Sequence, residues 1–246
     1  MNKLEEVQQK IKERGYWEIV LRPFQFQDKK FSHQQLRNWL QKHQVTNRGW
    51  YYPHISENKD YGDYYNVQGY VESYVHWSSY VENFRFYQSG QYVHYKGMQE
   101  DRINDDIPLS SQWNTSMQNP PPKQLFLEPI MALYQLTEIF LFASRLASEG
   151  VFGEQAVISI KLHNMNHRIL RTLDFRRPGF YNRECHSQKI ELGPFIKTPK
   201  DLESEYAKLA IDNAIGILAL FDYTSNTLRD TFEKDQQNFF NKTFSF

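Results

Sequence analysis

The sequence is poor in the residue patterns that identify a reaction. Its 246 residues include one cysteine, Cys185, which excludes an intrachain disulfide and a zinc site made of cysteines alone. Glycine is scarce, with 11 residues, and no glycine-rich phosphate loop occurs. The first residues lack the apolar core of a signal peptide. These absences lead us to expect a soluble protein of the cytoplasm.

The chain also lacks net charge. Its 29 lysines and arginines balance 29 aspartates and glutamates, so no global attraction to nucleic acid or anionic lipid exists. The most apolar stretch, residues 125–146, carries Glu128, Glu138 and Arg145. Those charges favour a buried helix over a membrane span. We therefore expect no membrane partner, and any binding of a polyanion has to come from local asymmetry of charge.

Aromatic residues are abundant, with 16 tyrosines, 18 phenylalanines and 5 tryptophans. Tyrosine suits half-buried sheet faces, because its ring packs while its hydroxyl stays in water. Alternation of apolar and polar residues predicts strands at 16–22, 67–77, 84–95, 157–162 and 169–175. Helical spacing predicts long helices over 125–146 and 198–221.

These elements predict one α+β domain over residues 1–246, in which a mainly antiparallel sheet with hairpins packs against two long helices. Residues 104–123 have no apolar periodicity and contain three consecutive prolines. A loop of that length is usually a lid, a binding loop or a linker. We expect it to be mobile.

The clearest predicted hairpin lies at 84–95. A two-residue turn at Ser89 and Gly90 would place Tyr87 opposite Tyr92. In that register, Phe84, Phe86, Val93 and Tyr95 share one face, and Arg85, Tyr87, Tyr92 and His94 share the other. The neighbouring strand adds Tyr70, Tyr74 and His76 to the second face.

This polar–aromatic face is the first candidate binding surface. Its members are Tyr70, Tyr74, His76, Arg85, Tyr87, Tyr92 and His94. Aromatic and arginine side chains on an open sheet stack on bases or on a nucleotide ring. The competing interpretation is an ordinary half-exposed sheet face, since tyrosine is a favoured strand residue in any case.

A basic segment at 161–189 is the second candidate surface. It holds seven lysines and arginines against two acidic residues. Arginines on a hairpin and its following loop suit contacts with phosphate, and the binding candidates are Arg168, Arg171, Arg176 and Arg177. The alternatives are a solvated face, or arginines paired with acids from elsewhere in the chain.

Metal and cofactor sites are not predicted. His163 and His167 have the spacing of two ligands on one helix face, but their context reads as strand, turn and strand. His54 with Glu57, Asp60 and Asp63 has no recognised metal spacing. We expect no metal and no cofactor.

Three segments together resemble a known family: 15–23 (GYWEIVLRP), 48–54 (RGWYYPH) and 85–94 (RFYQSGQYVH). They are similar to the C-terminal region of bacterial proteins that carry a Schlafen-type AlbA_2 DNA-binding domain at their N-terminus. The resemblance extends over most of the chain, and the AlbA_2 domain itself is not part of this sequence. It implies a bacterial accessory or sensing module and implies no active site.

The leading hypothesis is a non-enzymatic binding or sensing module for nucleic acid, a nucleotide or a protein partner, acting through the two surfaces above. One alternative is a phosphodiesterase or nucleotide hydrolase that uses His54 or His94 with nearby carboxylates. The other is a structural subunit of a larger bacterial complex, whose aromatic surface is an oligomer interface. Whether the chain forms a homo-oligomer stays open.

Overall fold

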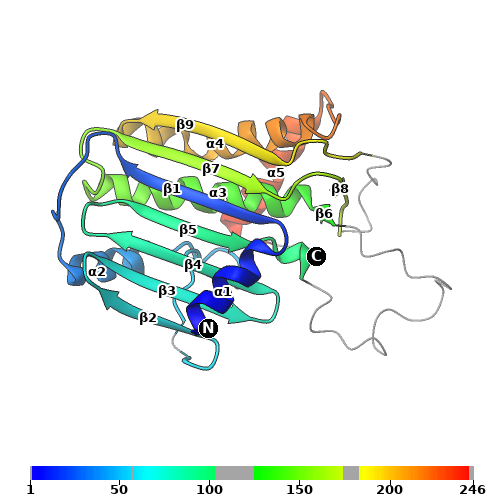
Figure 1. Ribbon diagram of the computed structural model, residues 1–246. Helices are drawn as coiled ribbons and strands as arrows, with labels where there is room; N and C mark the ends of the chain where they lie inside the picture. Colours follow the sequence, from blue (N-terminus) through cyan, green and yellow to red (C-terminus); the bar gives the residue numbers. More distant parts are fainter. Residues whose placement is uncertain (1, 57, 103–124, 174–182, 244–246) are drawn as a thin grey trace.

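A computed structural model describes residues 2–56, 58–102, 125–173 and 183–243. Its centre is a seven-stranded sheet with the order β2-β3-β4-β5-β1-β7-β9, in which every neighbouring pair is antiparallel (Figure 1). The helices are α1 (Lys3–Lys12), α2 (His33–His43), α3 (Pro129–Ser148), α4 (Pro199–Ala219) and α5 (Leu228–Asn241), with a 3-10 turn η1 (Gln99–Asp101). The sheet strands are β1 (Tyr16–Pro23), β2 (Gly62–Val67), β3 (Tyr70–Trp77), β4 (Tyr80–Tyr87), β5 (Tyr92–Gly97), β7 (Ala156–His163) and β9 (Lys189–Lys197). The predicted α+β class is confirmed.

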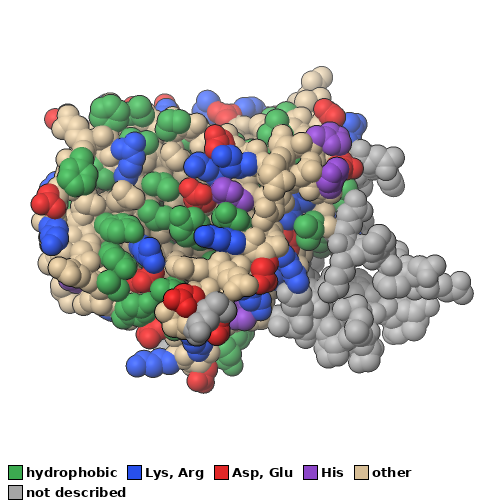
Figure 2. All heavy atoms as spheres, viewed as in Figure 1, with side chains coloured by type: hydrophobic (Ala, Val, Ile, Leu, Met, Phe, Trp, Pro, Cys, Tyr) green, Lys and Arg blue, Asp and Glu red, His purple; other side chains and the backbone are tan. Residues whose placement is uncertain are grey.

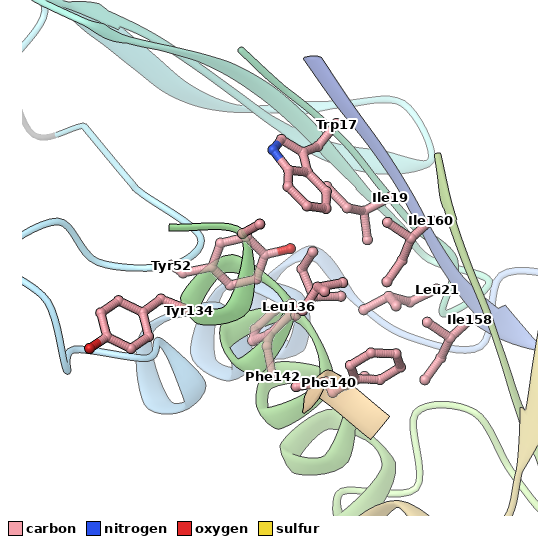
Figure 3. Close-up of a cluster of buried hydrophobic side chains, with 14 of the residues drawn as sticks. Trp17, Ile19, Leu21, Tyr52, Tyr134, Leu136, Phe140, Phe142, Ile158 and Ile160 are labelled. Carbon is pink, nitrogen blue, oxygen red and sulfur yellow. The ribbon is translucent and has the colours of Figure 1, made fainter. Parts of the chain in front are cut away.

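Strand β1 lies at the centre of the core. Trp17, Ile19 and Leu21 alternate with more exposed residues and are buried, as predicted. Figure 3 shows these side chains with Ile158 and Ile160 of β7, facing Phe140 and Phe142 of α3. Burial of such side chains contributes roughly 1.5–3 kcal/mol each, so this layer is a substantial source of the stability of the fold.

The predicted long helices are also confirmed. Thr198 caps α4 and makes a reciprocal pair with Asp201, while Pro199 occupies the first turn. Helix α3 is long and apolar enough to cross a membrane, but 78% of the window that meets this criterion is buried in the structure. That burial is the pattern of a core helix, which is the prediction made from Glu138 and its neighbours.

The small helix α1 packs on the opposite face of the sheet from α3 (Figure 1). Its capping box at Asn2 and Glu5 fixes its start. Val7 and Ile11 are buried against Tyr74 and Val81. One end of that face is therefore covered, and the remainder is open.

The predicted register of the β4–β5 hairpin is wrong by one residue. Tyr87 pairs with Gln91, and Phe86 lies opposite Tyr92. The loop has three residues, ending at Gly90 with φ of +86°. A turn followed by a left-handed glycine is the usual three-residue hairpin, and Gly90 fits here because a Cβ would lie 2.7 Å from the Val151 carbonyl oxygen.

The predicted return strand at 169–175 is also wrong over its described residues, 169–173. The partner of β7 is β9, with His163 opposite Lys189. Between them the chain leaves the sheet, and β8 (Ile169–Leu170) pairs in parallel with β6 (Phe126–Leu127) in a separate ladder. The reason is local: Asn164 and His167 have positive φ, which turns the chain off the sheet. The predicted mobile loop at 104–123 lies outside the described residues.

Candidate functional site

The structure divides the predicted polar–aromatic face. Tyr70, Arg85 and Tyr87 do share the open face, where the Arg85 guanidinium lies 5.4 Å from the Tyr70 ring centroid. The same arginine is held by Glu72 at 2.7 Å. Tyr74 is covered by α1, so only part of the predicted surface is accessible.

The remaining members of that face point elsewhere. His76 lies within 2.5 Å of Lys10 of α1, at the edge of the covered region. Tyr92 and His94 are fully buried on the opposite face of the sheet, so their predicted position beside Arg85 is wrong. The shift of one residue in the hairpin causes this, because it moves every side chain of β5 to the other face.

The predicted basic surface is also divided. Arg168 is fully buried, and both of its terminal nitrogens donate to Asp101 at 2.6 Å. Arg171 is exposed and lies over the Phe126 ring, while Arg176 and Arg177 fall outside the described residues. Figure 2 shows acidic and basic side chains interspersed on the visible face, with no single basic patch.

A cavity of about 550 Å³ opens at the end of the sheet, between the sheet and α3. Two of its lining residues are cross-strand partners: Trp17 of β1 lies opposite Lys96 of β5, which in turn lies opposite the buried Glu82 of β4. Residues opposite one another project to the same face, so these three side chains face the core together. Alternation along β5 therefore places a lysine where an apolar residue is usual.

Residues from six parts of the chain line this cavity. They are Trp17, Arg48, Gly49, Trp50, Trp77, Tyr80, Lys96, Gly97, Gln99, Glu100, Met131, Ala132, Gln135 and Leu173. Four of them are large aromatic side chains, and a cavity of this size suits a small organic molecule. The polar groups are few, which is the composition expected where a handful of contacts orient a ligand.

Stacked rings form one wall. Trp50 lies 3.6 Å from the His54 ring and 3.9 Å from the Tyr80 ring, nearly parallel to both. Two rings so close to one centroid have to lie on opposite faces, so Trp50 is held between them. Trp77, which is 45% exposed, is parallel to both Trp50 and Tyr80 and reaches the mouth of the cavity.

Glu82 fixes this wall from below. Its carboxylate accepts a hydrogen bond from Trp50 Nε1 at 2.7 Å and lies 2.8 Å from His94 Nε2. Burial opposes its ionisation, but the charge of Lys96 and the His94 bond outweigh burial and lower the pKa of Glu82 to about 2. Burial also lowers the pKa of His94, so we assign a neutral imidazole that donates to an ionised carboxylate.

Arg48 and Glu138 form a salt bridge on the side of the cavity next to α3. Two nitrogens of the Arg48 guanidinium, Nε and Nη2, donate to the two carboxylate oxygens, with distances of 2.8 and 2.5 Å. Glu138 is fully buried in α3, so this bidentate pair ties the loop before Trp50 to the long helix. Its charges cancel locally.

Three polar groups on the cavity wall are not held in an ion pair of this kind. Lys96 makes no ion pair or hydrogen bond with any residue that the structure describes, and its ammonium lies 5.8 Å from the Tyr52 ring centroid. The side-chain nitrogen of Gln135 is buried and has no partner within the same residues. Burial raises the pKa of the Glu100 carboxyl to about 7.

The cavity residues were not among the predicted site residues. Lys96 was missed because the two-residue turn assigned β5 the wrong face. Glu100 and Gln135 belong to a 3-10 turn and a helix that meet the sheet end only in three dimensions.

His163 and His167 do not converge on a metal. His163 stacks on Tyr16 and bonds Glu18, and His167 lies 2.5 Å from Glu184. Within the described ranges no group of three or more potential metal ligands occurs. No family model, curated protein or solved structure matches this chain.

Proposed function

We propose that this protein is a non-enzymatic binding or sensing module that takes a planar heteroaromatic ligand, of the nucleobase or nucleotide class, in the cavity at the end of the sheet. The observation that carries the proposal is a cavity of about 550 Å³ that has aromatic walls and three polar groups, Lys96, Gln135 and Glu100, that are not held in ion pairs. Aromatic walls favour flat rings, and the polar groups select among them.

The size of the cavity supports a single small molecule over a polymer. Ligand pockets of about 300–1,000 Å³ enclose most of a ligand's surface. A polymer needs an extended basic groove, and Arg168, which was expected to contribute to one, is buried against Asp101. Tyr70, Arg85 and Tyr87 remain on an open face, and their role in contacting nucleic acid or protein stays a prediction.

The hydrolase alternative has less support. His94 and Glu82 are adjacent but almost completely buried, and neither lines the cavity. His54 lies against Trp50, on the side of a neighbouring cavity. These groups hold the aromatic wall, and a general acid or base has to reach its substrate. The resemblance to the C-terminal region of AlbA_2 proteins also fits an accessory module of a bacterial cytoplasm.

Tryptophan fluorescence tests the proposal directly, because three of the five tryptophans line the cavity. The protein is titrated with the common nucleosides and their 5′-monophosphates. We expect saturable quenching by at least one of them. Trp77→Ala should weaken that ligand roughly tenfold or more, since aromatic stacking contributes about 1–3 kcal/mol per base.

Trp39→Phe provides the matched control. Trp39 packs against Phe31 at the edge of the core and does not line the cavity. This variant should bind as the wild type does. Absence of binding by the whole series, or equal loss in the Trp39 and Trp77 variants, would contradict a ligand site in the cavity.

A further inference from the structure

The unclosed polar groups of the cavity share one chemical property, which is that they donate hydrogen bonds. Lys96 carries an ammonium with three donors and no acceptor. Gln135 presents a buried side-chain nitrogen that has no partner in the described part of the chain. A buried donor without a partner costs about 1–3 kcal/mol, so a ligand that accepts from it gains affinity.

Glu100 is the third group on this wall. It is 7% exposed and belongs to the turn that follows β5. Burial raises its pKa to about 7, and the neighbouring carboxylates Asp101 and Glu128 add to the increase. Its own backbone N–H and Arg168 oppose the increase.

The charges facing Glu100 come from four other parts of the chain. Lys96 of β5 and Arg48 of the loop before Trp50 line the same cavity, while Arg168, just before β8, and Glu128, the N-cap of α3, act on Glu100 through their charges. Arg168 and Arg48 already form salt bridges with Asp101 and Glu138. Lys96 lies beside the ionised Glu82 and has no ion pair or hydrogen bond in the described residues, so its ammonium donors stay available, and Glu100 carries the exchangeable proton.

We infer that the ligand carries an oxyanion, held by three donors that meet on the cavity wall: the Lys96 ammonium, the Gln135 amide and the protonated carboxyl of Glu100. An ionised Glu100 would repel this group, so the protein takes up a proton when the ligand binds. This inference rests on the proposed function and deepens it. The oxyanion is either a phosphate or a carboxylate on the ring.

Calorimetric titration with two matched pairs of probes distinguishes these sources. UMP is compared with uridine, and orotate with uracil, at pH 6 and pH 8.5. We expect the anionic member of one pair to bind at least tenfold more tightly than its neutral partner at pH 6. A preference for UMP assigns the oxyanion to phosphate, and a preference for orotate assigns it to a ring carboxylate.

The dependence on pH tests the role of Glu100. Affinity for the anion should fall about tenfold per pH unit above 7, because each molecule bound then requires a proton. Glu100→Gln keeps a donor and should bind at pH 6, with the fall above pH 7 abolished. Lys96→Met should weaken the anion at least tenfold and leave the neutral partner within threefold.

The outcomes separate the two proposals. If neutral and anionic probes bind equally, or if affinity is independent of pH, the oxyanion inference is wrong and the binding function stands. If none of the four probes binds and the nucleoside series also fails, the proposed function is wrong. Should Lys96→Met fail to fold, the pH series on the wild type and on Glu100→Gln still decides the question.

Discussion

Glu82 and Glu100 are both buried glutamates at the same end of the sheet, and their surroundings are opposite. Glu82 accepts from Trp50, contacts His94 and lies beside the charge of Lys96, which together lower its pKa to about 2 against the effect of burial. Glu100 has no such set, and burial raises its pKa to about 7. A buried acid that has partners is ionised and stabilises its neighbours, whereas one without them holds a proton that it can exchange.

The same distinction separates structure from function elsewhere in the molecule. The pair of Arg168 with Asp101 and the pair of Arg48 with Glu138 are closed on both sides. Buried pairs of this kind have no charge left for a ligand. On the cavity wall, by contrast, the buried side-chain nitrogen of Gln135 has no partner among the described residues.

The largest effect is expected from replacing the Glu82 carboxylate. Glu82→Gln removes the carboxylate that Trp50, His94 and Lys96 require, and should lower the free energy of unfolding at pH 7 by about 3–5 kcal/mol. Urea denaturation measures the change. Glu191→Gln is the control, because that residue is exposed and pairs with Lys189 at the surface, so its effect should be close to zero. A loss below about 1 kcal/mol for Glu82→Gln would contradict the network described here.

The second-largest effect is expected at low pH, where protonation of Glu82 removes its contribution to the free energy of unfolding. Its folded pKa of about 2 lies below its ordinary value of 4.5, so its stabilising effect is complete above pH 4.5 and is lost as the pH falls through 2. The shift corresponds to about 3 kcal/mol. Unfolding free energies between pH 5 and pH 2 should be steeper in the wild type than in Glu82→Gln. Parallel profiles would place the acid transition in other groups.

Glu100 should have the opposite dependence and a somewhat smaller effect. Its folded pKa is raised, so its proton favours the folded state below pH 4.5, and this contribution is lost as the pH rises through 7. Above pH 7 the buried charge has a cost, so Glu100→Gln should stabilise the protein by about 2–3 kcal/mol at pH 8.5. Thermal and urea unfolding at pH 5 and pH 8.5 check this. Destabilisation at pH 8.5 would show that the ionised carboxylate is favourable.

The sequence predicted the scaffold because local patterns determine it. Alternation in Trp17, Ile19 and Leu21 predicted the central strand, and the Thr198 cap predicted the start of α4. Such signals depend on neighbours a few residues away. The α+β class followed from them.

The site could not be predicted in the same way. Its floor depends on the register of one hairpin, and a loop of three residues in place of two moved Lys96 and His94 to the core face. Arg168 appeared to be a surface charge because its partner, Asp101, lies 67 residues away in the sequence. Gln135 and Glu100 meet Lys96 only after α3 packs on the sheet.

The most direct test of the account counts protons. The more tightly bound of UMP and orotate is titrated at pH 7 in two buffers of different ionisation enthalpy, and the difference in heat gives the protons exchanged per ligand. With a Glu100 pKa of about 7, the wild type should take up about half a proton and Glu100→Gln none. Zero uptake by the wild type, or release of a proton, would contradict the claim that a protonated Glu100 holds the ligand.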